Sequence, residues 1–64
     1  MTFGEKLTLA LKYRNLKQKD LAKKINVTEV SVCRWCGDIR IPKISDVKKI
    51  CKAINVSADW LLDL

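Results

Sequence analysis

Three cysteines, Cys33, Cys36 and Cys51, are the side chains best suited to hold a metal ion. On a helix, Cys33 and Cys36 would lie roughly on one side, and Cys51 would supply a third ligand. A structural zinc site takes four ligands from cysteine and histidine, and the chain has no histidine and no fourth cysteine. We therefore predict no metal and no cofactor, with Cys36 and Cys51 as small core residues and Cys33 partly exposed.

A second group of side chains could recognise the edges of nucleic-acid bases. Val32 and Trp35 suit the inner face of a helix, which leaves Glu29, Val30 and Arg34 exposed. Positions 30 and 34 lie one turn apart on the same side. Arginine can form two hydrogen bonds with guanine, and valine can meet a thymine methyl group. Glutamate can accept a hydrogen bond from cytosine, but it repels phosphate, so it also excludes wrong sequences.

Each of these three side chains has a simpler structural interpretation. Arg34 would serve equally as a solvated helix residue. Glu29 would favour the positive end of the helix dipole. Val30 would suit a contact with another protein.

Five short helices are predicted to position these side chains, because apolar residues recur at helical spacing and no strand-like alternation is present. We expect them at about 3–14, 17–25, 29–36 and 45–54, with a last short helix after Ser57. The starts are marked by a capping box of Thr2 and Glu5, by the caps Thr28 and Ser57, and by Ser45 as a candidate cap. The ends are marked by Asn15, Asn26 and Asn55, which tolerate a left-handed stop. The stretch from Gly37 to Pro42 is predicted to be a loop.

The same spacing predicts which side chains the helices bury. Trp35 and Trp60 are expected as core anchors, and Ile44 as part of the apolar stripe of the fourth helix. Lys6 is placed on the polar side of the first helix. The lysines of the fourth helix are expected to form a solvated face, and they are Lys48, Lys49 and Lys52.

Length and charge limit the kinds of protein this can be. A chain of 64 residues makes one domain at most and leaves no room for an enzyme cleft. No apolar run approaches the roughly 20 residues of a membrane span. No catalytic nucleophile and base are paired, so we predict no enzyme. Residues 53–64 carry two acidic residues and no basic one, so the first 52 residues carry a net charge of +8. A strongly basic region of this kind favours a polyanionic partner.

Residues 17–36 combine two helices and a tight turn. Ala22 is small where the helices approach closely, Asn26 suits the turn, and Val27 holds the second helix against the first. In this arrangement, the helix-turn-helix, the second helix enters the major groove of DNA.

The sequence resembles the lambda-repressor-like (Cro/repressor, XRE-like) helix-turn-helix regulators. The resemblance runs from Phe3 to Leu62 and includes Leu16-Lys17-Gln18-Lys19-Asp20-Leu21-Ala22, Asn26-Val27-Thr28, Val32-Cys33-Arg34-Trp35, Pro42 and Ala53-Ile54-Asn55-Val56-Ser57-Ala58-Asp59-Trp60-Leu61-Leu62. It implies an all-α, five-helix DNA-binding domain over residues 1–64. Its second helix would be about 17–25 and its recognition helix about 28–36.

The resemblance also implies a role for each matching residue. Base contacts would come from Glu29, Val30, Ser31 and Arg34. Phosphate contacts would come from Lys17, Gln18, Lys19, Thr28, Arg40 and Lys43, and Gln18 would also brace the recognition helix. The implied protein is a phage or bacterial regulator, most simply a repressor, that binds an operator in double-stranded DNA.

Three positions depart from the family pattern. Many relatives carry an arginine and a glutamate, forming an ion pair, where this chain has Leu11 and Cys36. Since both partners are replaced by apolar residues, we predict that Leu11 and Cys36 lie close together. Asp38 stands where relatives usually have glycine. Aspartate tolerates the left-handed conformation less well than glycine, though better than most residues.

We expect a homodimer whose half-sites lie about 34 Å apart, with the interface at the apolar end from Trp60 to Leu64. A cytoplasmic protein without a small-molecule ligand fits the unpaired cysteines and the absence of a signal sequence. The length suits both a complete small regulator and the N-terminal domain of a longer repressor. The alternative function is a protein-interaction module such as an antitoxin-like partner. It predicts binding with little dependence on salt, whereas DNA binding weakens steeply as salt rises.

Overall fold

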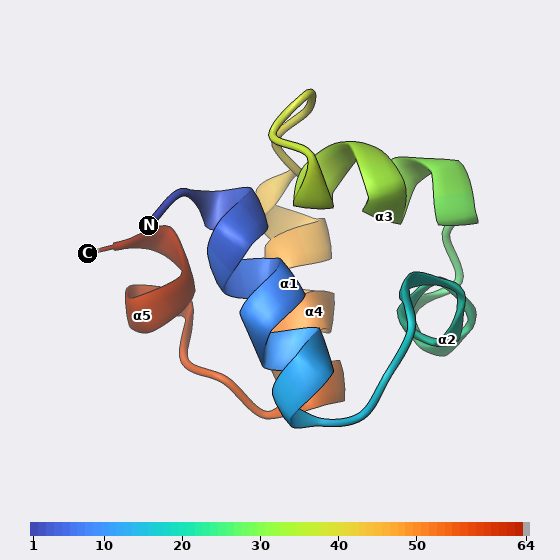
Figure 1. The fold of residues 1–64 in the computed structure, drawn as a ribbon, viewed down its shortest axis with the longest axis horizontal. Coiled ribbons are helices and arrows are strands. Elements are labelled where there is room, and N and C mark those ends of the chain that lie inside the picture. Colours follow the sequence, from blue (N-terminus) through green and yellow to red (C-terminus); the bar gives the residue numbers. More distant parts are fainter. Residues whose placement is uncertain (64) are drawn as a thin grey trace.

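Five helices make up the computed structural model, which describes residues 1–63 (Figure 1). They are α1 (Phe3–Tyr13), α2 (Gln18–Ile25), α3 (Glu29–Cys36), α4 (Ile44–Ile54) and α5 (Ala58–Leu62). No strand occurs among these residues, and the predicted all-α fold class is confirmed. No helix in the described part of the chain is long and apolar enough to cross a membrane.

Side chains satisfy free N–H groups at the starts of α1, α3 and α5. The Thr2 hydroxyl accepts from the Glu5 N–H at 3.1 Å, and the Glu5 carboxylate accepts from the Thr2 N–H at 2.8 Å, so the predicted capping box is confirmed. Thr28 and Ser57 cap α3 and α5 as expected. The prediction for Ser45 was wrong. Helix α4 already begins at Ile44, after an extended Lys43 that makes no side-chain cap.

An asparagine in the left-handed conformation stands at the end of three helices, as predicted. Asn15, Asn26 and Asn55 have φ values of 57°, 59° and 55°, in the left-handed region. No glycine is present at these positions, and asparagine is the residue that best replaces glycine there. The sequence therefore determines where α1, α2 and α4 stop.

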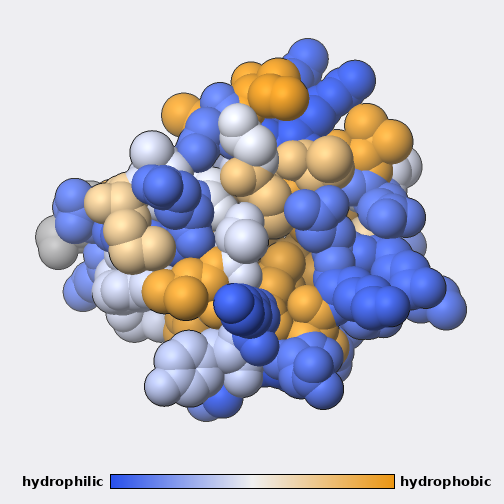
Figure 2. Space-filling view, viewed as in Figure 1, coloured by the Kyte–Doolittle hydropathy of each residue, from blue (hydrophilic) through white to orange (hydrophobic). Residues whose placement is uncertain are grey.

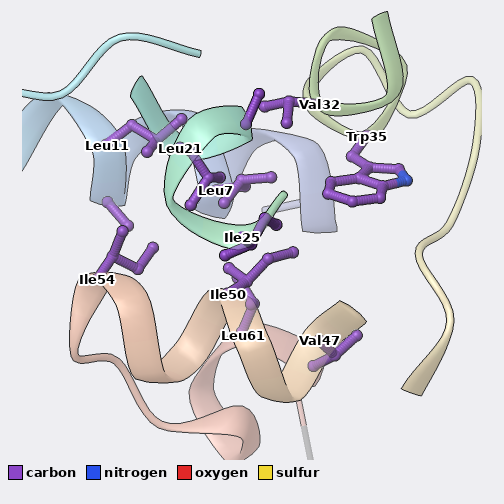
Figure 3. Close-up of a cluster of buried hydrophobic side chains, with 12 residues drawn as sticks. Leu7, Leu11, Leu21, Ile25, Val32, Trp35, Val47, Ile50, Ile54 and Leu61 are labelled. Atoms are coloured by element: carbon purple, nitrogen blue, oxygen red, sulfur yellow. The ribbon is translucent and has the colours of Figure 1, made fainter. Parts of the chain in front are cut away.

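The core lies where α1, α2, α3 and α4 converge (Figure 3). Leu7, Leu21, Val32 and Ile50 come from these four different helices, and each is fully buried. Helix α3 packs on α1 and α2, and α2 also packs on α4. Val32 and Trp35 turn inward from α3, as predicted, so the opposite side of α3 is left free.

Helix α5 is held differently from the prediction. Leu61 is its buried residue, whereas Trp60 is 40% exposed and is not a core anchor. Lys6, predicted on the polar side of α1, is instead buried at 8% exposure. Its Nζ donates to the Trp60 carbonyl at 2.9 Å and lies 3.4 Å from the Asp63 carboxylate. The long aliphatic stem of a lysine allows this, because the stem is buried while the ammonium group reaches polar atoms.

Two further helix positions complete the comparison with the sequence. Ile44 is 66% exposed, so it does not belong to the apolar stripe of α4, which begins at Val47. Leu11 is buried, and together with Cys36 it lines one surface hollow, so the two lie near each other as predicted. At the end of α1, Arg14 donates to the carbonyls of Ile54 and Asn55 at 2.9 and 3.1 Å, and so binds the end of α4.

Candidate nucleic-acid interface

The outer face of α3 presents the side chains that the sequence placed there. Glu29, Val30 and Arg34 are exposed, and Val30 has 57% of its surface accessible. Burial of Val32 and Trp35 on the opposite side fixes this orientation. Their exposure is therefore confirmed, while what they contact stays a prediction.

Cys33 belongs to the same face, and sequence reasoning gave it no role. It is exposed, three residues after Val30 and four after Glu29, so it lies on the same side of α3 as these two residues. The sequence predicted Cys33 to be partly exposed, and it is exposed. Its spacing from Glu29 and Val30 was sufficient to place it on this face.

The start of α3 is ordered by two hydroxyl groups. Thr28 Oγ1 accepts from the Ser31 N–H at 3.2 Å, and the two hydroxyl oxygens lie 3.0 Å apart. The Thr28 side chain is thus engaged as a helix cap, and Ser31 is only partly exposed. Thr28 and Ser31, both predicted DNA contacts, are therefore hydrogen-bonded to each other.

One hollow of 210 Å³ beside α3 brings together four of the predicted contacts. Ser31 and Arg34 come from α3, and Arg40 and Lys43 from the loop that follows it. Asp46, on α4, lines the same hollow and was not anticipated. On the face shown in Figure 2, hydrophobic side chains lie beside hydrophilic ones at the top, where Figure 1 places this loop. Ile39 and Ile41, on either side of Arg40, are 74% and 81% exposed.

Other predicted phosphate contacts gather at the start of α2. Lys17 and Gln18 line the hollow that also contains Leu11 and Cys36. Burial raises the pKa of the Cys36 thiol above its ordinary value, although the side chains of Thr8 and Gln18 act in the opposite direction. Lys19 is exposed but lines neither this hollow nor the one beside α3. Of the predicted phosphate contacts, Lys17 and Gln18 therefore lie at the start of α2, and Arg40 and Lys43 lie in the α3–α4 loop.

Asp38 determines the path of the loop after α3. Its backbone is left-handed, with φ 59°. Its carboxylate accepts from the Thr2 hydroxyl at 2.6 Å and from the Gly4 N–H at 2.9 Å. Both hydrogen bonds hold the pKa of the Asp38 carboxyl below its ordinary value. An aspartate can thus replace the usual glycine here because its side chain binds the start of α1.

This contact makes stability sensitive to acid. Because the pKa of Asp38 is lowered in the folded state, its contribution is present above about pH 4, the unfolded value, and is lost as pH falls further. Asp38→Asn keeps the tolerance for a left-handed backbone but removes the charge. We expect thermal melts between about pH 4 and 2 to depend less on pH in this variant. Asp59→Asn, at an exposed aspartate of α5, is the matched control, and an equal change in both variants would contradict the assignment.

Within residues 1–63, no three histidine, cysteine, aspartate or glutamate side chains converge as metal ligands would.

Comparison with known proteins gave two findings. A helix-turn-helix family model matches residues 9–61. Among solved structures, the chain is similar to the P22 c2 repressor, solved in complex with a synthetic operator, with a TM-score of 0.91 and 24% sequence identity. The similarity covers 95% of this chain and 92% of the repressor chain. No curated protein matches the sequence.

Proposed function

Because the chain belongs to the helix-turn-helix family, we propose that it is a DNA-binding transcriptional regulator of the repressor type that reads the major groove with α3. The outer face of α3 carries this proposal, since Glu29, Val30 and Arg34 are accessible there while Val32 and Trp35 hold the helix from behind. The P22 c2 repressor, whose fold this chain shares, was solved with an operator. That complex supports duplex DNA as the partner.

Base readout comes from the side chains on this face. Arg34 donates two hydrogen bonds to a guanine, and Val30 one turn earlier contacts a thymine methyl group. Glu29 accepts from a cytosine and repels phosphate, so it disfavours other sequences. The small thiol of Cys33 lets the groove approach the helix between these residues, and Ser31 contributes from the edge of the face.

Phosphate contacts hold α3 in the groove from two directions. One set lies at the start of α2 and the turn before α3, and it contains Lys17, Gln18, Lys19 and Thr28. The other set lies in the loop after α3 and contains Arg40 and Lys43. Because these contacts release counterions, affinity falls as salt rises.

Selection of bound sequences from random duplex DNA tests this function. We expect a defined motif to be enriched and the affinity to fall with salt, with a logarithmic slope of about −0.9 for each phosphate contacted. A pool that stays random, or an affinity that salt does not change, would contradict the proposal and favour a module that binds a protein.

A dimer on the operator is part of the proposal, with half-sites about 34 Å apart. Of the predicted interface from Trp60 to Leu64, Leu61 is buried and Leu64 lies outside the described residues, so Trp60 offers the main apolar surface. It shares a groove of 430 Å³ with Leu9 and Tyr13 of α1. We place the second subunit on this groove. A regulator of this kind acts where the DNA is, so the proposal includes the cytoplasm.

Tyr13→Glu is expected to weaken this dimer about 30-fold, because a charge would replace an aromatic anchor at the interface. Tyr13 is 87% exposed, so the fold should not change. Sedimentation equilibrium of the native protein and of the Tyr13→Glu variant measures the two dimer dissociation constants. If the dimer persists in Tyr13→Glu but dissociates in Ile41→Asp, the interface lies at the α3–α4 loop and not at this groove.

A further inference from the structure

A second basic surface lies between α2 and α4. Lys24, Lys49 and Lys52 line one hollow of 400 Å³, together with Ile25, Asn26 and Ala53, and we call it the α2–α4 basic hollow. No acidic side chain lines it. In residues 1–63 the ion pair within 4.0 Å is Lys6 with Asp63, so none of these three lysines is paired there. Three like charges around one hollow repel each other, and a bound anion would remove that repulsion.

The α2–α4 basic hollow is separate from the reading face of α3. Lys43 precedes the first residue of α4, and Lys52 comes nine residues later, which is about 13 Å along a helix. In Figure 1, α4 starts beneath the α3–α4 loop and runs away from α3. The two basic surfaces therefore lie toward opposite ends of α4.

Phosphate fits the α2–α4 basic hollow better than a protein does. Interfaces between proteins are enriched in aromatic anchors and depleted in lysine. None of the large exposed apolar residues lines this hollow, and its charged groups are all lysines. Lysine is a common ligand of phosphate, which it binds as a point charge. The lining thus has the composition of a surface for a phosphodiester backbone.

We propose that the α2–α4 basic hollow binds the backbone of a second DNA duplex, without sequence preference, so that one protein bridges two duplexes. We assign the hollow to a second duplex because it lies toward the opposite end of α4 from the α3–α4 loop, which contacts the first duplex in the proposed function. This inference rests on the proposed function, since the first duplex is held by α3.

A capture experiment tests the bridge. An immobilised short duplex is loaded with protein and washed, and a free fluorescent duplex of unrelated sequence is then added. The test variant is Lys24→Gln with Lys49→Gln. The control is Lys23→Gln with Lys48→Gln, which removes the same charge from the neighbouring exposed position in each helix, outside the hollow.

The native protein and the control are expected to capture the free duplex, and the test variant to capture about tenfold less. All three should load equally on the immobilised duplex. The inference is overturned if the native protein loads on the immobilised duplex but does not capture the free duplex. So does equal capture by both variants, which would mean that a dimer holds one duplex on each subunit. Labelled polyglutamate captured as well as DNA would also overturn it, in favour of an acidic protein. Failure to load at all overturns the proposed function instead.

Discussion

Gly4→Ala is expected to lower the free energy of unfolding by about 3 kcal/mol, because the added methyl group has no space. A Cβ at this position would overlap the backbone carbonyl of Cys36 and would lie 2.7 Å from Oδ2 of Asp38. The carbonyl is backbone, so it cannot turn aside as the end of a flexible side chain does. The start of α1 would have to move away from α3, and the hydrogen bond from the Gly4 N–H to Asp38 would be lost with it.

Thermal unfolding followed by circular dichroism measures this effect, and we expect a fall of roughly 15 °C in the melting temperature. The matched control is Gly37→Ala. Its φ is −88°, and the nearest atom to an added Cβ, the Cys33 carbonyl oxygen, lies 3.4 Å away. This variant should unfold within about 1 kcal/mol of the native protein. Equal melting temperatures for the two variants would mean that α1 does not pack so closely on the end of α3.

Arg34→Ala is expected to reduce discrimination at one base pair by about 1–3 kcal/mol, which is roughly 5- to 150-fold. Arg34 is exposed on α3 and lines the same hollow as Arg40 and Lys43. In our proposal it is the only side chain of the outer face that forms two hydrogen bonds with a base. Its loss should therefore relax the selected motif at the guanine position while the rest of the motif is kept.

Arg40→Ala separates base readout from phosphate contact. It removes the same charge from the same hollow, but on the loop. We expect it to weaken binding to all sequences alike, to leave the motif unchanged, and to reduce the salt slope by about 0.9. An unchanged motif in Arg34→Ala, or a relaxed one in Arg40→Ala, would show that the reading residue was wrongly chosen.

Much of the fold could be predicted because the signals are local. The Thr2–Glu5 box and the asparagine at position 26 act on backbone groups within a few residues, so their effect does not depend on the rest of the chain. The inward side of α3 follows from the spacing of Val32 and Trp35. From that spacing, the exposure of Val30 and Arg34 follows as well.

Where local signals conflict or are short, the prediction was wrong. Ser45 is a good cap by type, but α4 starts one residue before it. Trp60 is a large apolar side chain, yet α5 has five residues and only Leu61 reaches the core. Lys6 is charged, and it is buried because polar atoms of a helix more than fifty residues away lie within its reach.

The sequence by itself determined five helix segments, the caps of α1, α3 and α5, and the outward side of α3, because these depend on contacts between residues up to four positions apart. Only the tertiary structure decided which segments meet. It joins Asp38 to Thr2 and Gly4, surrounds one hollow with Arg34, Arg40 and Lys43, and gathers lysines of α2 and α4 around another. Such contacts join distant parts of the chain. They form only when the buried side chains pack together, and no local spacing specifies them.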